Sequence, residues 1–212
     1  MKQIRKEIAA IAAGLCIAVS SPGQAPAPGW FTKINSEIGW NVPNAYTFSV
    51  ADINNDNYPD ILVLDIPAGE NVYTVRKPLR IWLNVADEQS GNTTGRKFID
   101  ITSQKQVNAV PPDTGNHANC FTLADFNNDG NLDLVTGNFY YRIEQYTLPN
   151  DRCQVFLGDG TGNFNWVPDN GLKDLDLVNV RTLTALDYDR DGNLDLFIAP
   201  WFKDYTNNVF DH

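Results

Sequence analysis

The chain has 212 residues, of which 42% are hydrophobic and 11% aromatic, so it is long enough and apolar enough to fold around a sizeable core. Its formal charge is −10 and its isoelectric point is about 4.5. This balance argues against nucleic acid as a partner, because phosphate binding needs a basic surface. It is compatible with cation binding or with a solvated acidic surface.

The N-terminal segment differs in composition from the rest of the chain. Residues 1–7 are basic, residues 8–19 form an apolar run, and small residues follow. This layout is typical of a secretory signal peptide over residues 1–21, and the apolar run is too short to span a membrane. Residues 22–29 are rich in Pro and Gly and predict a flexible or polyproline-like linker. We therefore expect an exported protein, located extracellularly, in a periplasm or at a cell surface.

The expected signal peptide has more than one candidate cleavage site, and the sequence allows two alternatives to it. Cleavage is expected near Ser20–Ser21 or after Ala25. A lipid anchor at Cys16 is disfavoured by the bulky Leu15 before it, since such sites prefer a small residue. A further alternative is an apolar N-terminal helix that stays attached.

Three stretches further along share one pattern. They are ADINNDNYPDILVLDI from Ala51, ADFNNDGNLDLVTGN from Ala124 and LDYDRDGNLDLFIAP from Leu186. Each follows an alternating apolar run and leads into another, which predicts a strand, an acidic loop and a second strand.

Two further alternating segments follow the first two loops. They are LRIWLNVAD and CQVFLGDG, and each precedes a turn-rich stretch with an aromatic anchor, KFIDITSQ or NFNWVPDN. One unit is therefore four short strands in roughly 60–75 residues, a repeat that indicates β-propeller blades.

The phase of the repeat predicts an incomplete ring over residues 30–212. The segment GWFTKINSEIGW, residues 29–40, aligns with the fourth strand of the later units and is expected to be an orphan outer strand. Two full units and half of a third follow it. About two and a half blades do not close a ring, so we expect the N-terminal part of a longer all-β protein whose last blade the orphan strand completes.

The two cysteines that follow the signal peptide fall in one unit. Cys120 is expected on its first strand and Cys153 on its third. Those strands lie about 10 Å apart, whereas a disulfide needs Cα atoms within about 7 Å. Two free buried thiols are therefore favoured over a disulfide, which would need one cysteine displaced into a loop.

The acidic loops carry the candidate chemistry. Counted from the first aspartate, they run over residues 52–60, 125–133 and 187–195, and we call them the first, second and third loop. Oxygen-bearing side chains occupy positions 1, 3, 5 and 9, and position 7 could add a backbone carbonyl. The candidate ligands are Asp52, Asn54, Asp56, Tyr58 and Asp60; Asp125, Asn127, Asp129, Asn131 and Asp133; and Asp187, Asp189, Asp191, Asn193 and Asp195.

Converging carboxylates repel one another unless a cation lies among them. A site with six to eight oxygen ligands favours Ca²⁺ over Mg²⁺. It is also unlike a zinc site, which uses N or S donors. Position 6 is Gly130 or Gly192 in two loops, where a positive φ turns the chain around an ion, and Asn57 in the first. The first loop, which also has Pro59 at position 8, is the weakest candidate. A set of metal-free Asx turns is the alternative, and three copies at one spacing disfavour it.

An EF-hand is excluded. Its loop needs Glu at position 12 and flanking helices. Position 12 is here Val63, Thr136 or Ile198, each inside an expected strand.

The pattern Asp-x-[Asp/Asn]-x-Asp-Gly-x-x-Asp between strands resembles the FG-GAP/VCBS repeat of integrin-α-like β-propellers. VFLGDGTGNF, residues 155–164, is also similar to a blade of that family. The resemblance covers roughly residues 30–212. It implies a seven-bladed propeller with Ca²⁺ in the blade loops, usually outside the cytoplasm and often in adhesion or binding. The missing glycine of the first loop and the missing blades depart from it.

The ions are expected to be structural. Extracellular oxygen-ligand modules bind Ca²⁺ with Kd on the order of 10⁻⁴–10⁻³ M, and a ligand tenfold above Kd adds about 1.4 kcal/mol per site. Three such sites would add about 4 kcal/mol, a large part of a domain's net stability.

Catalysis has little support in the sequence. His117 is the only histidine away from the C-terminus, and no recognisable nucleophile motif accompanies it. We expect a binding or adhesion scaffold, not an enzyme, with an unidentified protein or carbohydrate ligand. The alternative is the propeller part of a secreted enzyme whose catalytic residues lie elsewhere. Aromatic residues could present stacking surfaces, although a role in the core is favoured for most: Trp30, Trp40, Trp82, Trp166, Trp201, Tyr140 and Tyr141.

Overall fold

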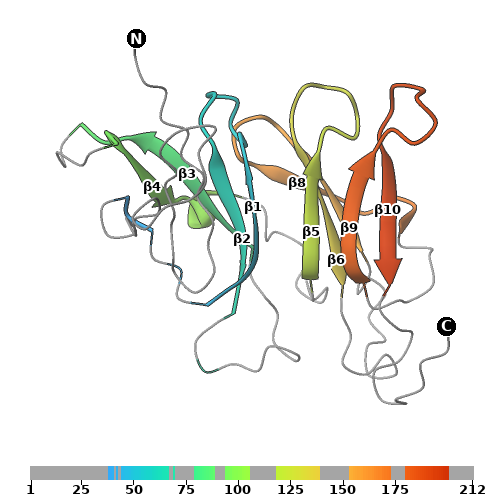
Figure 1. Ribbon diagram of the computed structural model, residues 1–212, viewed down its shortest axis with the longest axis horizontal. Coiled ribbons are helices and arrows are strands. Elements are labelled where there is room, and N and C mark those ends of the chain that lie inside the picture. Colours follow the sequence, from blue (N-terminus) through green and yellow to red (C-terminus); the bar gives the residue numbers. More distant parts are fainter. Residues whose placement is uncertain are drawn as a thin grey trace, which may run out of the picture.

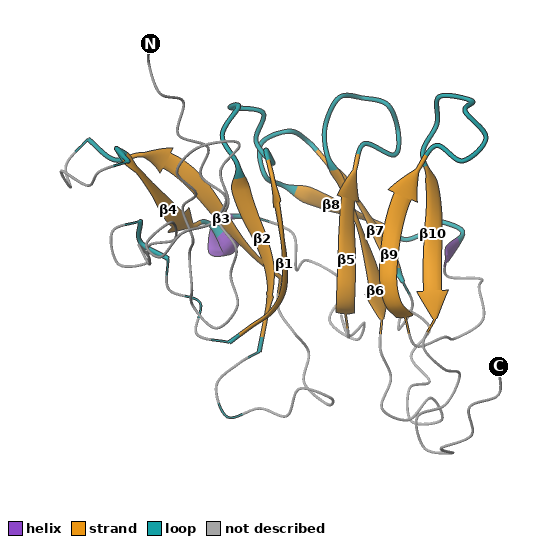
Figure 2. Ribbon diagram, viewed as in Figure 1, coloured by secondary structure: helices purple, strands orange, loops and turns teal. Residues whose placement is uncertain are grey.

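The computed structural model describes residues 38–40, 42, 44–66, 69, 79–88, 94–105, 118–138, 153–172 and 180–200. The expected signal peptide and linker, most of the expected orphan strand, and His117 lie outside these residues. Ten strands and one short 3₁₀ helix are found within them, arranged as three antiparallel sheets (Figures 1 and 2).

The first sheet has the strand order β1-β2-β3-β4 and the second has the order β5-β6-β7-β8. The third sheet pairs β9 with β10. The strands of the first sheet are β1 (Ala45–Ala51), β2 (Asp60–Asp65), β3 (Leu79–Ala86) and β4 (Arg96–Asp100), followed by η1 (Thr102–Gln104). Those of the other two sheets are β5 (Ala118–Ala124), β6 (Asp133–Asn138), β7 (Gln154–Gly158), β8 (Phe164–Val167), β9 (Val180–Leu186) and β10 (Asp195–Pro200). This confirms the expected all-β fold with two four-stranded units and half of a third.

The second strand of each four-stranded sheet is buried on both faces. In β2, Leu62 and Leu64 face the second sheet, whereas Ile61 and Val63 face the opposite way. Leu62 and Leu64 pack in the core between the first two sheets, together with Ile81, Ile101, Leu134, Phe156 and Phe164. Burial on both faces explains why β2 is a nearly continuous apolar run and not an alternating one.

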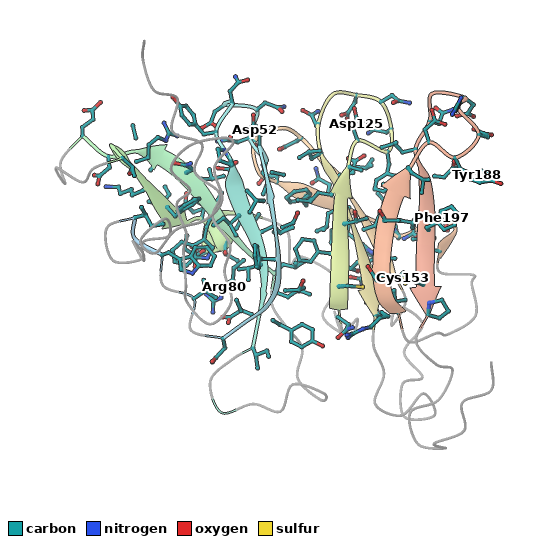
Figure 3. The ribbon with its side chains drawn as sticks, viewed as in Figure 1. Asp52, Arg80, Asp125, Cys153, Tyr188 and Phe197 are labelled. Atoms are coloured by element: carbon teal, nitrogen blue, oxygen red, sulfur yellow. The ribbon has the colours of Figure 1, made fainter. Side chains whose placement is uncertain are left out.

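The second and third sheets pack through a smaller core. Val135 of β6 meets Val180 and Leu183 of β9, with Leu196 and Ile198 of β10 beside them. Cys120 and Cys153 are half-buried at this interface, and no disulfide joins them. Figure 3 marks Cys153. The favoured prediction of unbridged thiols is confirmed, although both side chains are half-buried where full burial was expected.

The first strands of the three sheets lie side by side, and each has a β-bulge at its second residue: Tyr46, Asn119 or Arg181. A bulge re-aims the side chain of the extra residue. Here the Tyr46 hydroxyl donates to Asn119 Oδ1 (2.5 Å), and Asn119 Nδ2 donates to the Val180 carbonyl (3.2 Å). The bulges thus support a chain of hydrogen bonds from sheet to sheet.

The outer face of the first sheet is covered by the segment that precedes β1. Trp40 packs on Trp82, with ring centroids 5.3 Å apart, and edge-on against Phe98. The Ile38 carbonyl accepts a hydrogen bond from the Phe98 backbone N–H (2.7 Å). Trp40 and Trp82 are buried, and Trp166 packs against the main core, as the sequence predicts for most aromatics. Trp30, Trp201, Tyr140 and Tyr141 lie outside the described residues.

Candidate cation-binding loops

Each acidic loop joins the first strand of a sheet to the second, and the three loops lie along one edge of the molecule (Figure 1). Asp52, Asp125 and Tyr188 mark the three loops in Figure 3. All fifteen predicted ligand residues are described, and each set of five lies within one loop. Among the described residues, carboxylate oxygens of three of them, Asp187, Asp189 and Asp195, form a cluster.

The aspartate at position 1 shapes the loop by accepting two backbone hydrogen bonds. In the second loop, the Asp125 carboxylate accepts from the N–H groups of Asp129 (3.1 Å) and Gly130 (2.9 Å). The first loop repeats these bonds at 3.0 and 2.7 Å, and the third at 3.1 and 3.1 Å. One carboxylate therefore fixes the bend at positions 5 and 6 in every copy.

Positions 3 and 5 continue the same arrangement. Asn127 Oδ1 accepts from the Asp129 N–H (2.9 Å), and Asp129 Oδ1 accepts from the Asn131 N–H (2.8 Å). The first and third loops form the same two bonds at 2.7 to 3.3 Å. The bond to the position-7 N–H is the main cause that lowers the pKa of Asp129 and of Asp191. These bonds favour the ionised form of both carboxyl groups.

Position 9 begins the second strand, and its aspartate is fully buried in the first two loops. Asp60 accepts from the N–H groups of Ile53 (3.0 Å) and Asn84 (2.9 Å). Asp133 accepts in the same way from Phe126 (3.0 Å) and Gly158 (2.9 Å). These carboxylates tie the loop to the neighbouring strand β3 or β7.

Burial makes the charge at position 9 costly. Desolvation raises the pKa of Asp60 to about 6 and also raises the pKa of Asp133, against the lowering effect of their two backbone hydrogen bonds. Within the described part of the chain, no ion pair involves either carboxylate. A buried anion without a basic partner is the environment in which a bound cation is favourable.

The third loop has the most compact set of carboxylates. Oxygen atoms of Asp187, Asp189 and Asp195 lie within 4.8 Å of one another. Since Ca²⁺ binds oxygen at 2.3–2.6 Å, two ligand atoms of one ion can lie up to about 5 Å apart. Hard oxygen donors at this spacing fit Ca²⁺, with Asp195 exposed because no third strand covers it among the described residues.

The backbone bends as expected at position 6 and also at a residue that the sequence did not indicate. Position 6 has a positive φ in each loop: Asn57 (66°), Gly130 (86°) and Gly192 (90°). Position 4 has one as well: Asn55 (59°), Asn128 (60°) and Arg190 (63°). Asparagine tolerates a positive φ. Its presence at position 4 of the first two loops was therefore the one sequence feature that could have predicted this second bend.

Position 4 also connects neighbouring loops, which sequence reasoning missed. Asn55 Nδ2 donates to Asn131 Oδ1 (2.9 Å), from the first loop to the second. Asn128 Nδ2 donates to Asn193 Oδ1 (3.1 Å) and, at 3.5 Å, to the Gly192 carbonyl, from the second loop to the third. In both side-chain to side-chain bonds, position 4 donates to position 7 of the next loop.

The first loop differs from the other two at position 7. Its Tyr58 ring lies under the Arg96 guanidinium, 3.3 Å from carbon to ring centroid. Arg96 Nε also donates to Asn84 Oδ1 (2.8 Å). A fixed positive charge beside the loop opposes cation binding, and the weaker affinity expected of this site stays a prediction.

A scan against known protein families finds no match, and a search of curated proteins finds no similar sequence. Among the described residues, no helix has the length and apolar character needed to cross a membrane.

Proposed function

We propose that the chain is a calcium-binding repeat module of the FG-GAP/VCBS kind. In this proposal, Ca²⁺ in the acidic loops stabilises a stack of β-sheets that serves as an exported binding or adhesion scaffold. One observation carries the cation assignment: three carboxylates converge within 4.8 Å in the third loop, and the same hydrogen-bond frame recurs in the other two loops. The family assignment rests on the loop spacing and on the order of strands around it.

Within each loop, the side chains at positions 1, 3, 5 and 9 would hold the ion together with the position-7 carbonyl. Bound Ca²⁺ would neutralise the converging carboxylates. It would also supply the positive partner that the buried Asp60 and Asp133 lack among described residues. Because position 9 begins the second strand and positions 1 to 7 form the loop, the ion would fasten loop and sheet to each other. This is a stabilising role and not a catalytic one.

Thermal unfolding with Ca²⁺ and with a chelator tests the proposal, alongside calorimetric titration. We expect Ca²⁺ at tenfold above Kd to add about 1.4 kcal/mol per occupied site, which is visible as a rise in Tm. Asp191→Ala should reduce this rise. Asp159→Ala is the matched control, because Asp159 caps the β7–β8 turn through similar bonds outside the three loops.

Asp159→Ala should lower stability equally with and without Ca²⁺. A Tm that Ca²⁺ and chelator leave unchanged, with no heat of binding, would contradict the proposal. A calcium-dependent rise that Asp191→Ala leaves intact would place the ion elsewhere.

A further inference from the structure

The two side-chain to side-chain hydrogen bonds between neighbouring loops join ligand-bearing segments of different candidate sites. Asn128 is position 4 of the second loop. It therefore lies between positions 3 and 5, two of the residues expected to bind the ion of that loop. Its partner Asn193 is position 7 of the third loop, the residue expected to offer a backbone carbonyl. The 3.1 Å bond therefore links one candidate ion site directly to the next. Asn55 and Asn131 repeat the link one loop earlier.

A third element lies against the first of these links. Gly160, in the turn after β7, has a φ of +71°. A Cβ atom there would lie 2.3 Å from Asn131 Oδ1 and 2.8 Å from Asn55 Nδ2. The bare glycine backbone thus packs directly against the bonded amides. Although this bond is exposed, the glycine backbone limits the space available to the two amides on one side.

We propose that Asn55 and Asn128 are positioning residues that couple cation binding in one loop to cation binding in the next. The inference rests on the proposed calcium-binding function. An ion in the second loop further restrains positions 3 and 5, which hydrogen bonds already order, and so holds the Asn128 amide more firmly in place. The amide then holds Asn193, which preorganises the third loop for its own ion. Because a coupling free energy is reciprocal, an ion in the third loop strengthens binding in the second by the same factor.

The coupling can be measured because the third loop contains its own spectroscopic probe. Tyr188 at position 2 is 72% exposed and can sensitise luminescence of Tb³⁺, which takes the oxygen ligands of Ca²⁺. In a Tyr58→Phe background, the first loop lacks a tyrosine. Tyr188→Phe should then abolish the Tb³⁺ signal, which assigns it to the third loop.

Removing the link should weaken Tb³⁺ binding at the third loop about threefold, the effect of one modest hydrogen bond. Asn128→Gly deletes the donor without backbone strain. Asn193→Ala deletes the side-chain acceptor and leaves the longer bond to the Gly192 carbonyl. The double variant should bind no more weakly than Asn128→Gly alone. Asn55→Gly is the matched control, because it is the same change at the same loop position and its bond ends on the second loop. It should leave the third loop nearly unaffected.

A second comparison separates coupling from a purely structural tie. Asp129→Asn removes a carboxylate ligand from the second loop, but keeps an acceptor for the Asn131 N–H and leaves the Asp125 bonds that shape the loop. In that background, Asn128→Gly should have no further effect on the third loop, because no ion remains to transmit. If the bond only held the two loops together, Asn128→Gly would still weaken Tb³⁺ binding at the third loop about threefold.

The two proposals fail in distinguishable ways. Two results would overturn the coupling and leave the calcium function standing. One is Tb³⁺ binding in which the effects of the single variants add in the double variant. The other is an undiminished effect of Asn128→Gly in the Asp129→Asn background. Absence of Tb³⁺ luminescence, together with a Tm insensitive to Ca²⁺, would overturn both.

Discussion

The buried aspartate at position 9 should stabilise the protein even without a cation, and its exposed counterpart should not. Asp133→Ala leaves the N–H groups of Phe126 and Gly158 without the acceptor they have at 3.0 and 2.9 Å. An unsatisfied buried donor costs about 1–3 kcal/mol. Removing a desolvated charge offsets part of this cost, and the raised pKa of Asp133 gives the direction of that offset. We expect a net loss of about 3 kcal/mol in the free energy of unfolding.

Asp195→Ala is the matched comparison at the same loop position. Asp195 is exposed and accepts one hydrogen bond, from the Tyr188 N–H at 2.8 Å, which water can replace. In chelator, this variant should leave the free energy of unfolding nearly unchanged. Under the proposed function, it should instead lose the stabilisation that Ca²⁺ confers through the third loop.

Urea unfolding followed by tryptophan fluorescence measures both variants, in chelator and in Ca²⁺. The midpoint should shift for Asp133→Ala while the slope with denaturant stays constant, because the folded state remains the same. If Asp133→Ala fails to fold, Asp133→Asn keeps one acceptor oxygen and should lose about 1–2 kcal/mol. Equal losses for Asp133→Ala and Asp195→Ala in chelator would refute the reasoning from buried hydrogen bonds.

Three further predictions concern the sheet interface, the thiol and pH. Gly137→Ala should lower Tm by several degrees, because its Cβ would lie 2.6 Å from Val180 Cγ1 and 2.7 Å from Cys120 Sγ, and an unchanged Tm would contradict this packing. Burial raises the pKa of Cys120 to about 12, so iodoacetamide at pH 8 should modify it only after unfolding, as peptide mass spectrometry would show. The pKa of Asp60 is raised from 3.8 to about 6, so the folded state binds its proton more tightly. The stability that protonated Asp60 contributes to the folded state is complete below pH 3.8 and is lost as the pH rises through 6. In chelator, wild type should therefore lose stability relative to Asp60→Asn between pH 4 and 7 in urea unfolding, whereas a constant difference would contradict the burial argument.

The strands and the loop positions follow from local sequence patterns. The three acidic loops recur at one spacing between apolar runs, so the turn from first to second strand could be predicted residue by residue. β3 and β7 were predictable from alternation, and β4 and β8 from the aromatic anchor after a Gly-containing turn. Each of these signals lies within about ten residues of the element that it specifies, which is the range over which periodicity is informative.

The features that join one sheet to another could not be predicted in this way. The bulges at Tyr46, Asn119 and Arg181 carry no common residue type and leave the apolar alternation of the strands intact. The bond from Asn55 to Asn131 joins residues 76 positions apart. Position 9 looks like any other ligand position in the sequence, and only the packing of β3 or β7 beside it buries the carboxylate.

The first loop shows what specifies the shape of these loops. It has Asn57 where the other two have glycine, and Pro59 two residues later, yet its backbone follows the same course. The common element is the aspartate at position 1, whose two carboxylate oxygens accept the N–H groups of positions 5 and 6 in all three copies. Glycine at position 6 lowers the strain of a positive φ, but asparagine tolerates that conformation as well. The carboxylate therefore determines the fold of the loop. Since that carboxylate is also a predicted cation ligand, the frame that orders the loop without an ion already holds the oxygens near the place where an ion would bind.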